Sequence, residues 1–182
     1  VRVYENPEPE IQWKSFTDTA FLCHDECIDI FENVGTYTSY VWVDEYANAL
    51  GTGNDSIVLC GSNYSAAGDT FKIYVTAGEN GCDTTDSMYV VVWAKPEVFN
   101  IVPNGTVDFC WNTLGPDISI DSSLVGVNYE LFRAPATAVA NFDGVNGPLS
   151  FGNYNIPGDY YVVATDNLTG CKDTMNGVAT LV

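Results

Sequence analysis

The chain has very few basic side chains. It contains 6 lysines and arginines against 24 aspartates and glutamates in 182 residues, which gives a formal net charge of −18 at pH 7. Nucleic-acid binding needs clustered Lys and Arg to neutralise phosphates. Anionic membrane surfaces attract the same residue types. The composition therefore argues against both nucleic acid and an anionic membrane surface as partners.

Long apolar runs are also absent. The longest, Met88–Ala94, has seven residues, whereas a helix needs about 20 to cross a bilayer. The first residues carry Arg2, Glu5 and Glu8 and so do not form the apolar region of a signal peptide. We expect no membrane insertion. We infer that a targeting segment was removed or that the sequence is cut from a longer chain.

Catalytic residue patterns are scarce. An enzyme needs a general base or nucleophile beside a partner, and the single histidine, His24, lies between two cysteines. Neighbouring carboxylates such as Asp25 and Glu26 would point to opposite faces of a strand. No glycine-rich loop ending in Lys-Ser/Thr is present. The sequence predicts no enzyme, with no catalytic residue and no cofactor-binding residue.

Apolar residues are plentiful enough for a core. Hydrophobic residues make up 46% of the chain and aromatic ones 13%, which is unlike a disordered segment. Charged residues make up only 16%, against about 25% in ordinary soluble domains. Something other than charge is expected to hydrate the surface.

Six cysteines indicate an exported protein, because small exported β domains use disulfides to reinforce a thin core. The rival interpretation is a metal site at Cys23-His24-Asp25-Glu26-Cys27. Zinc sites favour a second close ligand pair, and the next cysteines, Cys60 and Cys82, are 22 residues apart. The sequence therefore predicts disulfides and no metal ligands.

An internal repeat divides the chain. Pro7 and Pro96 each stand in a Pro-Glu pair after a short β-type run, at an offset of 96 − 7 = 89. Cys82 and Cys171 each follow a glycine at the same offset, 171 − 82 = 89. A repeat at a fixed period indicates tandem domains. We predict domains over residues 11–95 and 96–182, preceded by a strand and linker over residues 1–10.

The segment Val1–Tyr4 corresponds, by the repeat, to the last strand of a domain. It is therefore expected to be the tail of a preceding domain, a strand donated to a neighbouring subunit, or a frayed arm. An unpaired strand leaves its backbone groups unsatisfied until it joins a sheet edge.

Both domains are predicted to consist of β-strands. Short apolar or alternating runs recur between turn residues, and 16 glycines with 8 prolines leave no room for long helices. The predicted strands are 11–16, 27–31, 37–43, 56–60, 70–76, 87–94, 98–102, 118–121, 127–133, 148–151, 159–165 and 176–182. Six or seven strands in about 89 residues is typical of an immunoglobulin-like sandwich. The predicted fold class is all-β: two tandem, disulfide-stapled immunoglobulin-like β-sandwiches.

Core and bridges follow from this arrangement. Trp42 with Tyr40 should form the aromatic core of the first domain, and Tyr129 with Leu131 that of the second. In the second domain only two cysteines are available. The first has four cysteines and three possible pairings. The pairs favoured by the repeat are Cys23–Cys82, Cys27–Cys60 and Cys110–Cys171.

The motif Gly-Asp-x-Phe/Tyr-x-Ile/Val followed by Gly-Cys, at 68–82 and 158–171, resembles PKD-like and immunoglobulin-like repeats of Bacteroidota surface proteins, including gliding-motility adhesins. Tyr40-Val41-Trp42 and the segment 126–131 share that resemblance, which covers nearly all of residues 11–182. It implies an extracellular or cell-surface structural or adhesive repeat. The Gly-Asp turn that follows the core tryptophan in PKD domains is missing after Trp42.

Seven of 15 aspartates precede Ser or Thr, where about two are expected by chance. Five of these pairs resemble the Asp-Ser/Thr-aliphatic O-glycosylation signal of that phylum, with Thr19, Ser56, Thr84, Ser87 and Thr174 as acceptors. The alternative is that Asp-Ser/Thr pairs simply open turns, where their side chains cap backbone groups.

A structural calcium ion is the one cofactor considered. Glu5, Glu8 and Glu10 precede one domain, and Asp143 and Asn146 lie in a glycine-rich turn. Carboxylate and amide oxygens suit calcium, although neither segment matches a known loop pattern.

The sequence thus predicts a structural or adhesive repeat of an extracellular, glycosylated fibre or long adhesin. Its partners would be neighbouring repeats, identical subunits or polysaccharide surfaces. The alternative is a carbohydrate- or protein-binding module appended to a secreted enzyme. Its candidate sugar-binding aromatics are Tyr154, Tyr160, Trp13 and Trp111.

Overall fold

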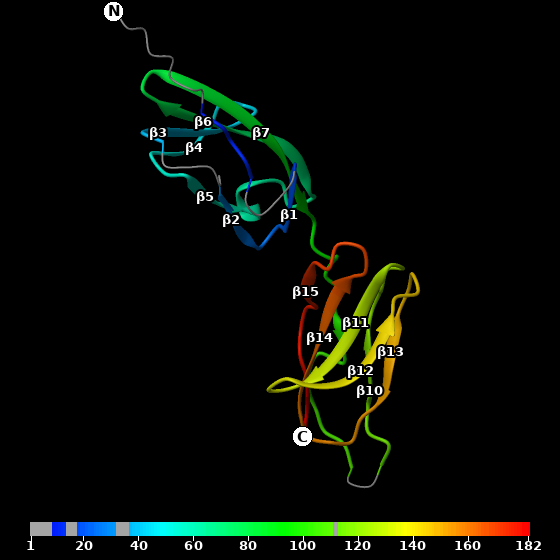
Figure 1. Ribbon diagram of the computed structural model, residues 1–182. Helices are drawn as coiled ribbons and strands as arrows, with labels where there is room; N and C mark the ends of the chain where they lie inside the picture. Colours follow the sequence, from blue (N-terminus) through cyan, green and yellow to red (C-terminus); the bar gives the residue numbers. More distant parts are fainter. Residues whose placement is uncertain (1–8, 14–17, 32–36, 111–112) are drawn as a thin grey trace, which may run out of the picture. The chain divides into compact units, whose positions relative to one another are not determined.

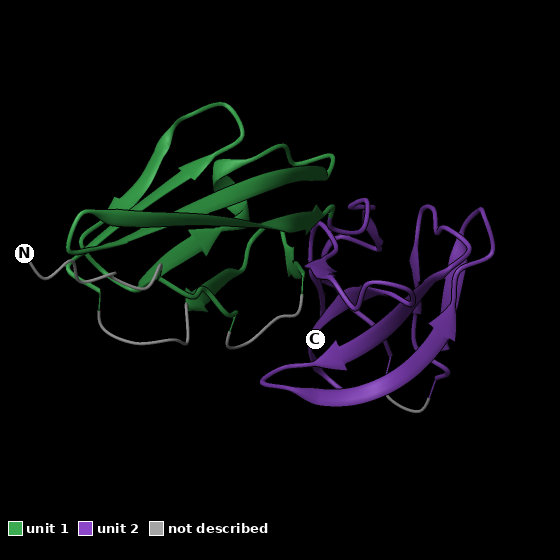
Figure 2. Ribbon diagram, turned by 45° about the horizontal axis from the view of Figure 1, so that its top comes forward, with its two compact units in different colours: residues 1–94 green, residues 95–182 purple. Residues whose placement is uncertain are grey.

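The computed structural model describes residues 9–13, 18–31, 37–110 and 113–182. The chain divides into two compact units, residues 1–94 and 95–182, coloured separately in Figure 2. Within the described residues, regular structure consists of β-strands and one short 3-10 turn, Gly61–Asn63. The predicted all-β fold class is confirmed. No helix in this part of the chain is long and apolar enough to span a bilayer.

The first unit contains a five-stranded sheet in the order β1-β7-β6-β3-β4 and a two-stranded sheet, β2-β5 (Figure 1). Neighbouring strands are antiparallel, except that β1 runs parallel to β7. The strands are β1 Thr19–Cys23, β2 Cys27–Phe31, β3 Ser39–Asp44, β4 Ala49–Thr52, β5 Ser56–Cys60, β6 Asp69–Glu79 and β7 Cys82–Trp93.

The second unit repeats this plan. One sheet has the order β12-β11-β14-β16-β9 with β15 also paired to β14, and the other has the order β13-β10-β8. Here β9 runs parallel to β16, as β1 does to β7. The strands are β8 Ile101–Val102, β9 Gly105–Val107, β10 Asp117–Ile120, β11 Val127–Arg133, β12 Thr137–Asp143, β13 Leu149–Asn153, β14 Gly158–Asp166, β15 Lys172–Thr174 and β16 Ala179–Leu181.

The core of each unit forms between its two sheets. In β6 every second residue from Phe71 to Ala77 is buried, because successive side chains of a strand point to opposite faces. The predicted core aromatics are confirmed: Trp42 and Tyr129 are completely buried, and Tyr40 is 5% exposed. Trp42 donates a hydrogen bond from Nε1 to the carbonyl oxygen of Asn54 at 2.9 Å, so its polar atom is satisfied as well.

The central strands of the two units carry matching core pairs. Trp42 pairs with Val75 and Tyr129 pairs with Ala164; the two partners are 164 − 75 = 89 positions apart, and the two aromatic residues are 129 − 42 = 87 apart. Tyr160 begins the inward face of β14 and donates its hydroxyl to the carbonyl oxygen of Ile156 at 2.8 Å. A tyrosine bonding the backbone a few residues upstream at the start of this strand is a hallmark of immunoglobulin-like sandwiches.

A tight turn joins the two longest strands, β6 and β7. Asn80 and Gly81 both have positive φ, 51° and 82°, and Glu79 pairs with Cys82 across them. Asn-Gly is the preferred sequence for a two-residue hairpin turn with left-handed backbone at both positions. This hairpin extends both strands well beyond their predicted ranges.

Several strand predictions need correction. Of the predicted strand 11–16, only Trp13 forms a bridge among the described residues, and residues 14–17 lie outside them. The strands β1, β4, β9, β12 and β15 were not predicted. β1 and β9 are edge strands, which pair with β7 and β16 respectively. Their formation depends on this tertiary pairing, which local alternation does not encode.

Candidate functional site

One predicted bridge is present. Cys27 and Cys60 form a disulfide with an S–S distance of 1.97 Å. They stand directly opposite one another on the neighbouring strands β2 and β5 (Figure 1). Their Cα atoms are 4.0 Å apart, close to the spacing of a non-hydrogen-bonded antiparallel pair. The bridge therefore fixes the register of the two-stranded sheet.

The predicted Cys23–Cys82 pair is wrong, because Cys82 is a free thiol. Cys23, at the end of β1, pairs in register with Trp93, the last residue of β7. Cys82 is the first residue of that same strand, 93 − 82 = 11 residues away, or about 36 Å at 3.3 Å per residue. A disulfide needs Cα atoms less than about 7 Å apart.

The predicted Cys110–Cys171 pair is wrong for the same reason, and Cys110 is an exposed free thiol. Cys171 lies opposite Asp166, at the end of β14. Cys110 follows β9, whose Val107 pairs with Leu181, which in turn lies opposite Gly158 at the start of β14. Gly158 and Asp166 are 166 − 158 = 8 residues apart along β14, or about 26 Å. Cys110 and Cys171 therefore lie near opposite ends of this strand.

The five candidate glycosylation acceptors all lie on strands. Thr19 is in β1, Ser56 in β5, Thr84 and Ser87 in β7, and Thr174 in β15. Thr174 is exposed and the other four are partly buried. Asp-Ser/Thr pairs at these positions therefore do not open turns.

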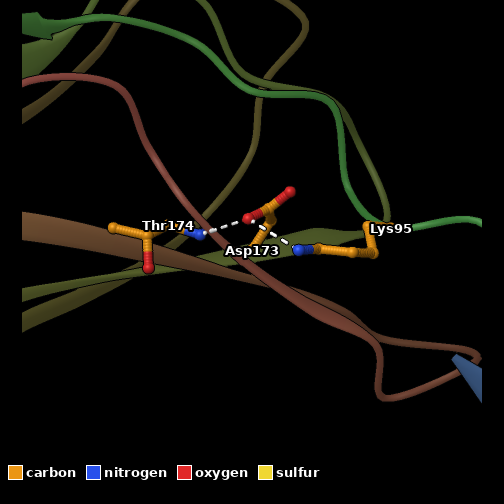
Figure 3. A network of polar contacts seen from close by, with 3 residues as sticks. All are labelled: Lys95, Asp173 and Thr174. Atoms are coloured by element: carbon orange, nitrogen blue, oxygen red, sulfur yellow. Dashed lines mark hydrogen bonds and ion pairs between the residues drawn. The ribbon is translucent and has the colours of Figure 1, made fainter. Parts of the chain in front are cut away.

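The preceding aspartates hold the local backbone. Asp86 accepts the backbone N–H of Ser87 at 2.7 Å. Asp173 accepts the backbone N–H of Thr174 at 2.8 Å, and the same carboxylate oxygen lies 3.0 Å from Nζ of Lys95 (Figure 3). The hydroxyl of Thr174 takes part in neither contact.

Polar side chains elsewhere mainly organise loops. Asp44 is 6% exposed, and its carboxylate accepts N–H groups from Tyr46 and Asn48 and the amide of Asn48 at 2.7–2.9 Å. Burial by itself raises the pKa of Asp44, but these hydrogen bonds outweigh it and hold the pKa below its ordinary value. This carboxylate anchors the turn after β3.

Two more aspartates follow that pattern in the second unit. Hydrogen bonds from the backbone of Thr169 and Leu168 lower the pKa of Asp166. The side chain and backbone N–H of Asn100 do the same for Asp121. Asp166 thus holds its own turn, as in an Asx turn, whereas Asp121 joins its segment to Asn100, 21 residues earlier in the chain.

The candidate calcium ligands are engaged elsewhere or undescribed. Asp143 accepts from Asn128 at 3.0 Å, and Asn146 accepts the N–H of Val125 at 3.1 Å. Glu10 accepts from Nε2 of Gln12 at 3.1 Å, and Glu5 and Glu8 lie outside the described residues. No three His, Cys, Asp or Glu side chains gather as a metal site within the described part of the chain.

His24 lies in the turn after β1, partly buried. Its backbone N–H donates to the carbonyl oxygen of Trp93 at 3.0 Å. Its imidazole makes no hydrogen bond to any described residue.

Of the proposed sugar-binding aromatics, two are structural. Tyr160 is 1% exposed. Trp13 packs edge-on against Trp42 at 5.9 Å and donates from Nε1 to Asp86 at 3.0 Å. Trp111 lies outside the described residues, and Tyr154 lines the groove of the second unit.

An aromatic face on the first unit was missed. Phe21 and Trp93 stack with ring centres 5.0 Å apart, and Nζ of Lys72 lies 4.7 Å from the ring centre of Tyr89. Phe21 and Tyr89 are almost half exposed. The signal was the unbroken apolar run from Met88 to Ala94, since a strand with apolar residues at every position has two apolar faces.

The second unit carries an open groove of about 310 Å³. Its lining comes from the end of β11, the start of β12, the loop before β14 and the start of β14. The lining residues are Arg133, Thr137, Ala138, Val139, Tyr154, Ile156 and Tyr160.

The topology defines a class: a tandem pair of immunoglobulin-like sandwiches, each with a parallel first strand on its main sheet. No protein-family model matches the chain, and no curated protein matches it either.

Solved structures similar to the chain include fibronectin(III)-like modules of Clostridium thermocellum CbhA, with 10% identity, 94% coverage of both chains and a TM-score of 0.41. The insect immune protein hemolin shares 10% identity over 99% of this chain and 48% of its own, with a TM-score of 0.45. The FN1–FN3 domains of chicken CNTN1 share 9% identity over 87% of this chain and 61% of theirs, with a TM-score of 0.42.

Proposed function

We propose that the chain is a structural or adhesive repeat segment of an extracellular fibre or long cell-surface adhesin, and that it has no catalytic role. The observation that carries this proposal is the recurrence of one sandwich plan, with matching strand order and a spacing of 164 − 75 = 89 residues between Val75 and Ala164, the partners of the two core aromatics. Repeated modules of this kind provide length and surface. The wider protein would be of the PKD-like type found at the surface of Bacteroidota.

The Cys27–Cys60 bridge supports an extracellular location, since disulfides persist in oxidising compartments. Neighbouring repeats or identical subunits are the proposed partners. Electron microscopy of the native material tests this: filaments or long stalks are expected. Isolated globular particles at all concentrations would contradict the assembly.

We further propose O-glycosylation at Thr19, Ser56, Thr84, Ser87 and Thr174. Thr174 is the best placed, because it is exposed and Asp173 holds its backbone (Figure 3). Glycans there would add hydration that the low charge fraction does not provide, and would shield strand edges against aggregation.

Intact mass spectrometry of the protein from its native host tests the modification. A mass above that of the polypeptide is expected, reduced by one glycan in Thr174→Val. The matched control is Thr52→Val, an exposed threonine on β4 that follows glycine instead of aspartate. The bare polypeptide mass for the unaltered chain would refute this proposal.

A further inference from the structure

The groove of the second unit contains an arginine at a position that faces the core. Leu131 and Tyr129 of β11 are completely buried, and Arg133, two residues further on, continues the same face and pairs in register with Tyr160. It is the only arginine among the described residues. Its guanidinium makes no hydrogen bond or ion pair with any of them.

The fold does not require a cation there. Tyr129 corresponds to Trp42, so Arg133 corresponds to Tyr46, four residues after that tryptophan. Tyr46 is 71% exposed in the turn after β3. The first unit therefore builds the same sandwich without a charge at this position.

The arginine side chain is supported along its length. A Cβ atom added at Gly158 would lie 3.3 Å from both Cγ and Cδ of Arg133, so the stem rests on the glycine backbone. Gly158 also has φ +143°, a conformation that side-chain-bearing residues rarely adopt. The apolar stem is packed while the charged end remains available, as is usual for long cationic side chains.

The walls around this cation are apolar and held in place. Tyr154 donates its hydroxyl to the carbonyl oxygen of Phe151 at 2.9 Å, and Tyr160 donates to Ile156 at 2.8 Å. The two rings lie 5.5 Å apart. Both tyrosines therefore fix the loop before β14, and Ile156 remains 54% exposed at the rim.

The electrostatics favour an anionic ligand. None of the groove's lining residues is acidic, although the whole chain carries a net charge of −18. Arginine binds a carboxylate through two parallel hydrogen bonds, and the hydroxyl of Thr137 is the other side-chain polar group exposed there. The volume of about 310 Å³ lies at the lower end for small-molecule pockets.

From this geometry we propose that the groove binds a uronic acid unit of an acidic polysaccharide. The carboxylate lies on Arg133, the apolar face of the sugar ring lies against Tyr154 and Ile156, and a sugar hydroxyl bonds Thr137. An open groove that ends in one cation suits a repeating acidic sugar, one unit of which enters while the rest of the chain continues outside. This activity goes beyond the structural role and holds whether or not the protein forms fibres.

The test is titration of the full chain with a uronate oligosaccharide, followed by calorimetry and by NMR shifts of the groove residues. Saturable binding is expected, and the methyl-esterified oligosaccharide, which has no charge, should bind at least about tenfold more weakly. Arg133→Gln should weaken binding by about tenfold or more. Arg133→Lys should recover part of that loss, since it keeps the charge but not the two-pronged geometry.

Two variants separate the site from general charge and from folding. Lys172→Gln removes the same unit charge from an exposed position on β15, and it should bind as the unaltered chain does. Thr137→Val changes an exposed residue, so it should leave the fold intact while reducing affinity several-fold. Thr137→Val and the comparison of charged with esterified sugar remain informative even if Arg133→Gln fails to fold.

Three results would overturn the proposal. They are absence of uronate binding by the folded chain, equal affinity for the charged and esterified sugars, and equal losses in the Arg133 and Lys172 variants. Binding of a short acidic peptide in place of the uronate, dependent on Arg133, would reject the sugar in favour of a protein ligand.

Discussion

Replacing Cys27 and Cys60 together by alanine should destabilise the first unit strongly. The bridge joins positions 33 residues apart, and the loop-closure relation gives about 3.7 kcal/mol at 25 °C for a loop of that length. The stabilisation arises mainly because the bridge restricts the unfolded chain. In the folded unit the two strands remain paired along five residue pairs, so the loss should appear without a change of fold.

Urea unfolding of the full chain, followed by tryptophan fluorescence, measures this effect. Three of the four tryptophans, at positions 13, 42 and 93, lie in the first unit, so the signal reports chiefly on that unit. With a urea dependence of about 1 kcal/mol per M for a domain of this size, a loss of about 3.7 kcal/mol should lower the midpoint by roughly 4 M.

The matched control is Cys82→Ser, which removes a thiol that is free in the structure. Its free energy of unfolding should change by less than about 0.5 kcal/mol. If the alanine pair costs under about 1 kcal/mol, or if the Cys82 variant costs as much as the pair, the pairing described here is wrong.

Three further outcomes are expected. Tyr160→Phe should lower the stability of the second unit by about 1 kcal/mol in urea unfolding, because the carbonyl oxygen of Ile156 loses the hydroxyl that donates to it; no change would contradict that role. The pKa of Asp166 is lowered in the folded state, so its contribution is complete above the unfolded value of 3.8 and disappears as the pH falls through the folded pKa. The melting temperature should therefore fall in acid, and it should fall less in Asp166→Asn. A maleimide reagent should label Cys82 and Cys110 in the native protein and leave the bridged pair unlabelled; labelling of the bridged pair would refute the assignment.

Strong local patterns led to correct predictions. The ranges 27–31, 56–60 and 127–133 match β2, β5 and β11, because alternation with β-branched and aromatic residues is itself the requirement for a half-buried strand. The buried positions of Trp42 and Tyr129 followed from the same alternation. The Cys27–Cys60 pair could be predicted because each cysteine bordered a clear strand.

The edge strands were harder to predict. β12 has only partly buried and exposed residues, so its sequence shows no apolar face. β4 spans four residues and contains a glycine. Such strands form because a neighbour offers free backbone groups, and this is a property of the sheet rather than of the segment.

By itself, the amino-acid sequence determined the fold class, the 89-residue repeat and the core aromatics, because each depends on periodic burial that is written locally along the chain. Only the tertiary structure decided which cysteines can meet and where Arg133 points. β1 runs parallel to β7, and β9 runs parallel to β16. This direction places Cys23 and Cys110 at the end of the sheet opposite to their predicted partners. The groove likewise joins residues from β11, β12 and the loop before β14. Their proximity depends on the packing of two sheets, which no spacing in the sequence specifies.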